Sequence, residues 1–327
     1  MSHITFIHGI ANKPPQGELL KFWRNALARD SGINLGAHGI SSSMVYWADV
    51  MYATPLDEET SYESEAVPSP DLGAAAQEPG VDPAWKSELS DDERLWLKQL
   101  EMKVKFEAVA DNLGTAAEGA LEEEGAGPEG ESPESEYERI WLPAAVKKKL
   151  MELFLRDVHH YLFNATNSPR AGSTFRVQDE IRRRMLKALE EDAGKNKTGP
   201  HVIVSHSMGT VISYDCLMRV PGCPRVDALV TIGSPLGLDE IQDALKPQHT
   251  TRDGYPSANV SKSWVNVFDR LDPVAGLDPE LANDYQRGGE LVIEDIHEPN
   301  WGPWRHDITK YLRGAKLRAK LKQLLQV

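Results

Sequence analysis

Short apolar runs alternate with longer amphipathic stretches in the first fifty residues of the chain and again after residue 200. The short runs are rich in β-branched and aromatic residues, which is typical of strands; they cover residues 4–7, 44–47, 201–204, 228–232, 264–268 and 291–293. The longer stretches have apolar residues at helical spacing and cover residues 17–30, 175–193, 208–219 and 307–325. Wholly apolar strands that alternate with helices predict a mostly parallel, doubly wound sheet covered on both faces, which is an α/β fold.

The region of residues 50–170 interrupts this alternation, and we interpret it as an insertion. Within it, residues 54–83 and 114–138 are rich in Pro, Glu, Ser, Ala and Gly and show no hydrophobic period, so we expect them to be mobile. Between them, an apolar stripe predicts a helix from residue 90 or 91 to residue 113. A second helix is predicted from residue 140 or 143 to residue 163. The insertion is therefore expected to be largely helical, with mobile acidic loops.

The net charge is concentrated in this insertion. The chain carries a formal net charge of −14, yet residues 57–138 alone hold 24 acidic and 5 basic side chains, so the rest of the chain is mildly basic. An acidic chain repels the phosphate backbone of nucleic acids. We therefore expect no nucleic-acid partner.

A chain of 327 residues can bury a sizeable core without disulfides, and we expect residues 1–327 to form one domain. No apolar run approaches the roughly 18 residues that a membrane span requires. The start, Met1–Phe6, lacks the basic and apolar segments of a secretory signal. Cys216 and Cys223 have no second ligand pair beside them, so we interpret them as spectator thiols and expect no metal site. These features favour a cytoplasmic protein.

The clearest chemical signal is the segment Val202–Val211, V-I-V-S-H-S-M-G-T-V. An apolar strand leads into Ser207, small residues stand two positions before and after it (Ser205 and Gly209), and a helix follows. This is the context of a nucleophile elbow, in which a crowded turn projects the serine hydroxyl from the sheet edge. Ser205 stands where such elbows usually have Gly. The helix N-terminus would direct the N–H group of Met208 to the same place.

These segments resemble the α/β-hydrolase superfamily and, within it, the lipase- and esterase-like serine hydrolases. Val204–Leu217 is similar to the family's elbow and the helix after it, and Ile7–Ile10 (I-H-G-I) is similar to its oxyanion strand. Ile232–Gly237 (I-G-S-P-L-G) is similar to the strand end that follows the elbow helix in lipase-type members. The resemblance covers residues 1–50 and about 175–327, and it implies the α/β-hydrolase fold. Two of the family's usual N-terminal strands are missing.

A serine nucleophile needs a base, because a free hydroxyl is barely nucleophilic at neutral pH. The family's chain order of Ser, acid and His implies His306 as the base, at the start of the C-terminal helix, with His297 as the alternative. The same order implies Asp272 as the acid, just beyond the strand 264–268, with Asp269 as the alternative. The acid would orient the imidazole and stabilise its protonated form.

The other histidines carry no catalytic motif. The side chain of His206 is expected to point away from the nucleophile into the sheet layer, as a structural residue. The pair His159 and His160 lies on a predicted helix, where adjacent side chains face different directions, and we interpret it as a surface or core pair. The remaining histidines are interpreted as structural: His3, His38, His201 and His249.

The resemblance also implies an oxyanion hole formed by the backbone N–H groups of Ile10 and Met208, which would bind the negative charge that develops during acyl transfer. Gly9 permits close approach of the backbone to a ligand. Three residues on loops at the same end of the predicted sheet are candidates for an acyl-binding pocket, with packing in the core as the alternative: Leu236, Trp301 and Trp304. No metal or cofactor is required.

The function that the resemblance implies is cleavage of carboxylic esters through an acyl-enzyme on Ser207. The substrate would be a small-molecule ester or a lipid, with transient contact with a lipid surface. The lipase-like G-S-P-L-G segment and the predicted helix 91–113 favour lipidic acyl chains; this helix is interpreted as a lid or as a helix packed permanently on the domain. One alternative is acyl transfer to an alcohol by the same acyl-enzyme. The other is a non-catalytic interaction module that uses the acidic insertion as its contact surface.

Overall fold

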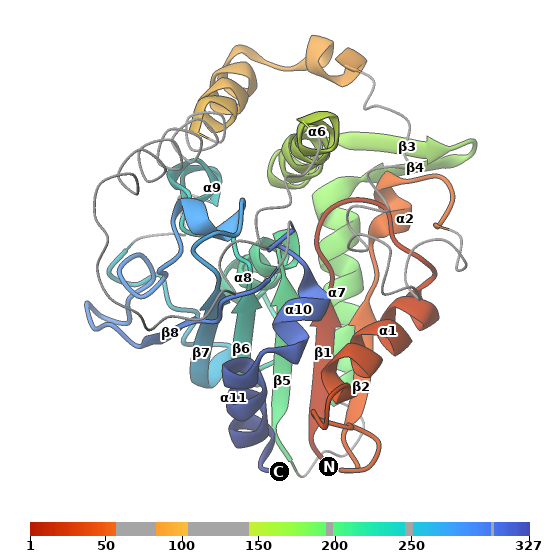
Figure 1. Cartoon of the computed structure of the whole chain (residues 1–327). Helices are drawn as coiled ribbons and strands as arrows, with labels where there is room; N and C mark the ends of the chain where they lie inside the picture. The colour runs from red at the N-terminus through yellow and green to blue at the C-terminus, as the bar shows by residue number, and fades with distance from the viewer. Residues whose placement is uncertain (57–82, 104–143, 194–198, 246–250, 302–303) are drawn as a thin grey trace, which may run out of the picture.

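The computed structural model describes residues 1–56, 83–103, 144–193, 199–245, 251–301 and 304–327 (Figure 1). Its centre is a six-stranded sheet in the order β2-β1-β5-β6-β7-β8, and every neighbouring pair in it is parallel. The strands are β1 (His3–Ile7), β2 (Ser41–Val45), β5 (His201–His206), β6 (Val226–Ile232), β7 (Val260–Phe268) and β8 (Ile293–His297). The predicted α/β fold with a mostly parallel sheet is confirmed.

Helices cover both faces of this sheet (Figure 1). Helices α1 (Gln16–Ala28), α10 (Ile308–Arg313) and α11 (Ala315–Leu325) share a buried cluster with Ile4 and Phe6 of β1. Helices α7 (Val177–Ala193) and α8 (Met208–Arg219) share the other cluster with Ile7 of β1 and Ile203 of β5. The alternation of side chains along each strand thus divides the core into two apolar layers.

The strand order reverses between β1 and β5, since β2 lies beyond β1 on one side and β6 lies beyond β5 on the other. In open parallel sheets, ligands bind outside the carboxyl ends of the strands at this switch point. Gly9 follows β1 closely at this edge, and Ser207 follows β5 directly. The topology therefore brings two of the predicted site residues to the place where such sheets bind ligands.

Several parts of the fold differ from the sequence predictions, and among them is the last strand, which was predicted at residues 291–293 and lies at Ile293–His297. The hairpin of β3 (Thr166–Arg170) and β4 (Ser173–Arg176) was not predicted, because its alternate residues are exposed and its sequence is polar. The predicted helix 307–325 is two helices, because Gly314 between α10 and α11 has an extended backbone. A β-carbon added at Gly314 would lie 2.6 Å from Cδ of Glu298. The Glu298 carboxylate accepts the N–H group of Leu317 and thereby caps the start of α11.

The predicted insertion is described only in part. The stretches 54–83 and 114–138 lie almost entirely outside the described residues. The predicted helix 91–113 is helical over residues 91–103, and its remainder is also outside them. Its buried Trp96 donates Nε1–H to the carbonyl oxygen of Glu240, next to the start of α9 (Asp239–Leu245). Helix α6 (Ala144–Leu162), the second predicted helix, lies beyond the carboxyl ends of the strands (Figure 1).

The end of α6 buries two adjacent imidazoles. The ring of His159 stacks on Phe163 with centroids 4.9 Å apart, and Trp85 lies 5.0 Å from His159 and 5.4 Å from His160. Burial lowers the pKa of His160 to about 4, and the neighbouring charges of His159 and Arg156 act in the same direction. The pair therefore belongs to the core.

We expect His160 to make the protein sensitive to acid. Its folded-state pKa lies below the unfolded value of about 6.5, so the unfolded chain binds a proton more readily than the folded one. The folded state therefore has its full stability above pH 6.5 and loses stability as the pH falls toward 4. Between pH 7 and pH 5 this linkage lowers the free energy of unfolding by about 2 kcal/mol. Urea unfolding at pH 7 and at pH 5 measures this effect. Between the two pH values, the free energy of unfolding of His160→Gln should fall by about 2 kcal/mol less than that of the wild type. An equal loss in the two proteins would contradict this assignment.

Candidate active site

Ser207 occupies a sharp turn between β5 and α8. Its φ of 53° and ψ of −130° lie outside the regions that non-glycine residues ordinarily adopt, and such strain persists only where the surrounding structure enforces it. A β-carbon added at Gly209 would lie 2.7 Å from the carbonyl oxygens of Ile7 and His8. One added at Gly9 would lie 2.6 Å from Cβ of Ser207. The turn therefore requires small neighbours, as the sequence motif predicts.

Ser205 takes the position that is usually Gly in such elbows. Its side chain is fully buried, and Oγ donates a hydrogen bond of 3.0 Å to the carbonyl oxygen of Val230 on the neighbouring strand β6. The additional hydroxyl is thus satisfied inside the sheet, so the departure from Gly adds no unpaired polar group.

The backbone N–H and C=O groups of Ser207 are both hydrogen-bonded, whereas its side-chain hydroxyl is not. Its N–H group donates to the carbonyl oxygen of Ile232, and its own carbonyl oxygen accepts from the N–H and Oγ1 groups of Thr210. The side chain is 1% exposed, and within the described part of the chain Oγ has no hydrogen-bond partner. A buried hydroxyl in this condition is available to a base or a ligand.

His306 and Asp272 form a buried hydrogen-bonded pair at the same edge of the sheet. Nδ1 of His306 lies 2.8 Å and 2.9 Å from the two carboxylate oxygens of Asp272, and both residues are 2% exposed. Asp272 lies on the turn after β7, and His306 lies in the loop before α10. Asp307 caps α10 by accepting the N–H group of Thr309, which anchors the residue next to His306.

Several donors hold the Asp272 carboxylate in its charged form. Oδ1 accepts the N–H groups of Val274 and Ala275, and Oδ2 accepts the hydroxyl of Tyr311 at 2.7 Å. Burial alone would raise the pKa of Asp272, but the charge of His306 and these hydrogen bonds outweigh it, so the pKa is lowered. A carboxylate at Nδ1 places the imidazole proton on that nitrogen, which leaves Nε2 as a proton acceptor.

Gly233 and the imidazole of His206 both lie against the pair of His306 and Asp272. A β-carbon added at Gly233, which follows β6 with a φ of 56°, would lie 3.1 Å from Oδ2 of Asp272 and 3.2 Å from Nδ1 of His306. The ring of His206 lies 4.7 Å from that of His306, and its Nε2 is 3.0 Å from the His306 carbonyl oxygen. As expected, His206 points into the layer of α1 and α10, where its ring lies 6.4 Å from that of Trp23 and 6.5 Å from that of Tyr311, and in this position it also contacts His306.

The two alternative residues form a separate cluster. The Asp269 carboxylate accepts the N–H groups of Leu271 and Asn300 and pairs with Arg305 at 3.2 Å. His297 has a side chain that is 43% exposed, and its Nε2 lies 4.0 Å from Asp269. Asp269 therefore shapes a turn, and the hydrogen-bonded pair of His306 and Asp272 does not include either alternative.

The loop after β1 is oriented by helix α6, through a residue that sequence reasoning missed. The N–H group of Ala11, which has a φ of 67°, donates to Oδ2 of Asp157 at 3.0 Å. The same carboxylate is wholly buried and accepts the hydroxyl of Tyr52 and the guanidinium of Arg156. The signal in the sequence was a lone Asp among the apolar residues of a predicted helix.

Ile10 and Met208, the predicted oxyanion-hole residues, directly follow Gly9 and Ser207. Met208 begins α8, and the first N–H groups of a helix have no intrahelical acceptor. On the other side, Asp157 engages the N–H group after Ile10, and Nζ of Lys13 donates to the Ile10 carbonyl oxygen at 2.7 Å. Both bonds are made by the single peptide that joins Ile10 to Ala11, so they fix the orientation of the peptide on the carboxyl side of Ile10.

His8 supports the same loop from the side of β2. The backbone N–H group of Trp47 donates to Nε2 of His8, and the Trp47 indole donates to the His8 carbonyl oxygen, each at 3.0 Å. The two rings stack with centroids 4.7 Å apart. Because Nε2 accepts a hydrogen bond, the ring proton lies on Nδ1 and donates to the carbonyl oxygen of Gly9 at 2.8 Å.

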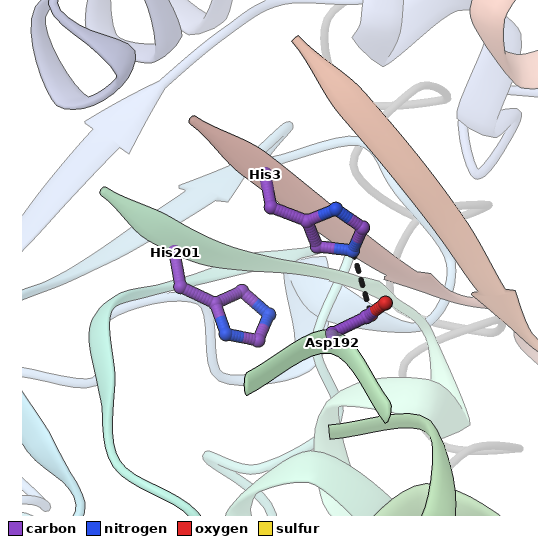
Figure 2. Close-up of side chains that lie close together, drawn as sticks. All are labelled: His3, Asp192 and His201. Carbon is purple, nitrogen blue, oxygen red and sulfur yellow. Dashed lines mark ion pairs between the residues drawn. The ribbon is translucent and has the colours of Figure 1, made fainter. Parts of the chain in front are cut away.

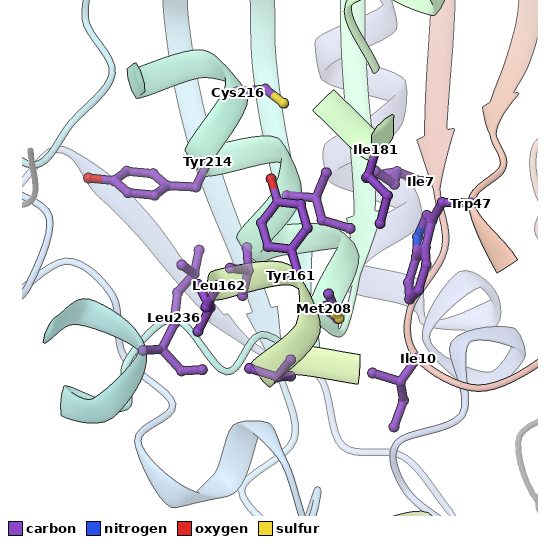
Figure 3. Packing of buried hydrophobic residues seen from close by; sticks show 14 of the residues in the cluster. Ile7, Ile10, Trp47, Tyr161, Leu162, Ile181, Met208, Tyr214, Cys216 and Leu236 are labelled. Carbon is purple, nitrogen blue, oxygen red and sulfur yellow. The ribbon is translucent and has the colours of Figure 1, made fainter. Parts of the chain in front are cut away.

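The residues predicted to line a pocket lie at different depths. Leu236 is wholly buried, and Figure 3 shows it among the residues of the apolar cluster that includes Ile10, Met208 and Leu162 of α6. Trp304 is buried, with its ring edge-on to His306 at 5.8 Å. Trp301 is 39% exposed. Trp304 thus contacts the site, whereas the ring of Trp301 lies under the guanidinium of Arg313, 5.1 Å from its centroid.

Comparison with known proteins assigns no family. No family model matches the chain, and no curated protein matches it. A solved structure of an uncharacterized protein from Pseudomonas aeruginosa is similar at 10% identity with a TM-score of 0.27, over 91% of this chain. The chain spans 40% of the length of that protein. Among the described residues, no helix has the length and apolar character needed to cross a membrane.

Proposed function

We propose that this protein is a serine hydrolase with an α/β-hydrolase fold that cleaves carboxylic esters. The observation that carries the proposal is the buried pair of His306 and Asp272, which lies at the same sheet edge as the strained Ser207 elbow. The serine hydroxyl is buried and has no hydrogen-bond partner in the described structure, so it is available to a base. A nucleophile, a base and an acid that orients the base are the parts that acyl transfer requires.

In the proposed reaction, Ser207 Oγ attacks the acyl carbon while Nε2 of His306 takes up its proton. The N–H groups of Ile10 and Met208 stabilise the oxyanion of the tetrahedral intermediate. His306 then gives the proton to the leaving alkoxide, and an acyl-enzyme remains on Ser207. Water attacks this ester with His306 again as base, which releases the carboxylic acid and restores the serine.

Helix α6 and residues 91–103 are proposed to form a cap over this site. Leu162 of α6 belongs to the same buried cluster as Ile10 and Met208, so the surroundings of the elbow are apolar. An apolar enclosure excludes water and suits a hydrocarbon chain. We therefore propose a lipidic or other apolar acyl ester as the substrate class.

The test is the initial rate of hydrolysis of p-nitrophenyl esters from acetate to palmitate, together with labelling by a fluorophosphonate. We expect turnover, an optimum above the shortest chains, and one label per chain, found by mass spectrometry on the peptide that contains Ser207. No turnover and no label on Ser207 would overturn the proposal and favour a non-catalytic module.

Asp157 is expected to act as a positioning residue for the oxyanion loop. In Asp157→Ala, the N–H group of Ala11 loses its acceptor, so the Ile10–Ala11 peptide loses this bond and keeps the bond from Lys13, and the loop is held less firmly. We expect kcat to fall about 10- to 100-fold with KM nearly unchanged, because the loop stabilises charge that exists mainly in the transition state.

The matched control is Tyr52→Phe, which removes another hydrogen bond to the same carboxylate oxygen and leaves the Ala11 contact intact. Its kcat should remain within about threefold of the wild type. Steady-state kinetics should be paired with urea unfolding, since loss of a buried carboxylate also lowers stability. Equal kcat values for the two variants would argue against a positioning role.

A further inference from the structure

A second cluster of chemically reactive side chains lies at the opposite end of the sheet from Ser207. His3, Asp192 and His201 each direct one nitrogen or oxygen atom toward the others, and these atoms lie within 4.8 Å of one another (Figure 2). All three side chains are buried. His3 and His201 stand at the amino ends of β1 and β5, so this cluster is distinct from the candidate active site.

Strand register brings these residues together. His3 pairs with His201 across β1 and β5, and it pairs with Ser41 across β1 and β2. Paired residues of neighbouring strands project from the same face, and Thr5, two positions after His3, projects there as well. Helix α7 covers this face, and Asp192 in its last turn lies against the polar residues. The site thus connects β1, β5 and α7.

The donor atoms are joined by short contacts. Oδ2 of Asp192 lies 2.6 Å from Nε2 of His3 and 3.0 Å from Oγ1 of Thr5. The same Oγ1 lies 2.8 Å from Nε2 of His201. The Thr5 hydroxyl therefore bridges the carboxylate and the second imidazole, and both imidazoles present Nε2.

A second set of contacts orients the ligand atoms. Nδ1 of His3 lies 2.7 Å from Oγ of Ser41, and this contact fixes the plane of the ring with Nε2 turned inward. Hydrogen bonds of this kind, from the nitrogen that does not bind the metal, are a regular feature of metal-ligating histidines. Oγ of Ser43 also contacts Oδ2 of Asp192, at 2.5 Å.

We propose that His3, Asp192 and His201 bind a divalent transition-metal ion, with Zn²⁺ as the best match. Two imidazole nitrogens and one carboxylate oxygen are a donor set that zinc uses, with the Thr5 hydroxyl or water in the fourth position. Bonds of about 2.0–2.1 Å in a tetrahedral site place ligand atoms roughly 3.3 Å apart. The His3–Asp192 contact would widen from 2.6 Å by less than 1 Å as the ion replaces the shared proton.

The chemical role of such an ion is structural. It would link residues 3, 192 and 201, which are far apart in the sequence, and its binding would release the proton held between His3 and Asp192. Because a preformed site does not exist in the unfolded chain, binding would stabilise the folded state. The site does not depend on the function proposed for Ser207.

The test uses the full chain stripped with a chelator and then titrated with ZnCl2 against a chromophoric competitor. We expect one ion per chain in the wild type and a rise in the thermal unfolding temperature. In His201→Gln and in Asp192→Asn, the affinity should fall at least about 100-fold. His38→Gln is the matched control, since His38 is exposed, and it should bind as the wild type does.

Binding at the level of buffer controls, or equal binding by the wild type and both ligand variants, would overturn the proposal. A cobalt titration of the wild type keeps the test decisive if a ligand variant fails to fold. Cobalt bound by two imidazoles and a carboxylate in a four-coordinate site absorbs strongly in the visible range. The weak spectrum of hexaaqua cobalt throughout the titration would also overturn it.

Discussion

Ser207→Ala is expected to lower kcat/KM for p-nitrophenyl esters by at least about 10⁴-fold, because the acyl-enzyme can no longer form. The backbone of the elbow is held by the hydrogen bonds to Ile232 and Thr210, which the substitution leaves intact. The variant should therefore fold, and removal of a buried hydroxyl without a partner should not lower its stability. Initial rates and urea unfolding of the same preparation measure both effects.

Ser205→Ala is the matched control, since it removes a serine hydroxyl two residues before Ser207, in the strand β5 that leads into the turn. Its hydroxyl donates to the Val230 carbonyl oxygen, so its loss should cost about 1 kcal/mol of stability and leave kcat/KM within about threefold of the wild type. Residual activity that is the same in the Ser207 and Ser205 variants would show that Ser207 is not the nucleophile.

His306→Gln is expected to lower kcat by at least about 10⁴-fold, since a glutamine cannot accept the serine proton. KM should change little, because the base acts on the transition state rather than on substrate binding. Asp272 would retain the hydrogen bonds from Val274, Ala275 and Tyr311, so its charge remains partly compensated. The measurement is steady-state kinetics on the ester with the highest wild-type rate.

His297→Gln tests which of the two candidate histidines is the base. His297 ends the last strand, and His306 follows that strand. His297 lies near Asp269 and is largely exposed, so its loss should leave kcat within about threefold of the wild type. If His297→Gln lost activity and His306→Gln kept it, the base would be assigned wrongly. The same comparison tests the Asp272 assignment indirectly, since of these two histidines it is His306 that is hydrogen-bonded to that carboxylate.

The sheet could be predicted from the sequence because its central strands are short, wholly apolar runs. Strand β2 was placed three residues too late, since Ser41–Ser43 have little intrinsic preference for strands and form one by pairing with β1. The break at Gly314 could not be predicted because it depends on the carboxylate of Glu298, which contacts the chain from another loop. Tertiary contacts decided both cases.

The candidate site was predictable where local sequence defines its geometry. The elbow around Ser207 and the turn after β7 each lie within a few residues, and the chain order then pointed to His306. Asp157 was missed because its partner Ala11 is 146 residues away, so no local pattern connects them. The cluster at His3 and His201 was missed for a related reason, since only strand register brings these two residues together.

The hydrogen bond from Ala11 to Asp157 has a consequence for the modularity of this chain. The segment of residues 50–170 interrupts the α/β pattern as an added module would, yet its helix α6 supplies the carboxylate that shapes a loop of the main sheet. A shortened protein that joins residue 50 to residue 170 would lack this carboxylate and leave the buried Ala11 amide without its acceptor. The insertion and the sheet are therefore linked by this contact, and any replacement for the insertion would have to supply an acceptor for the Ala11 amide.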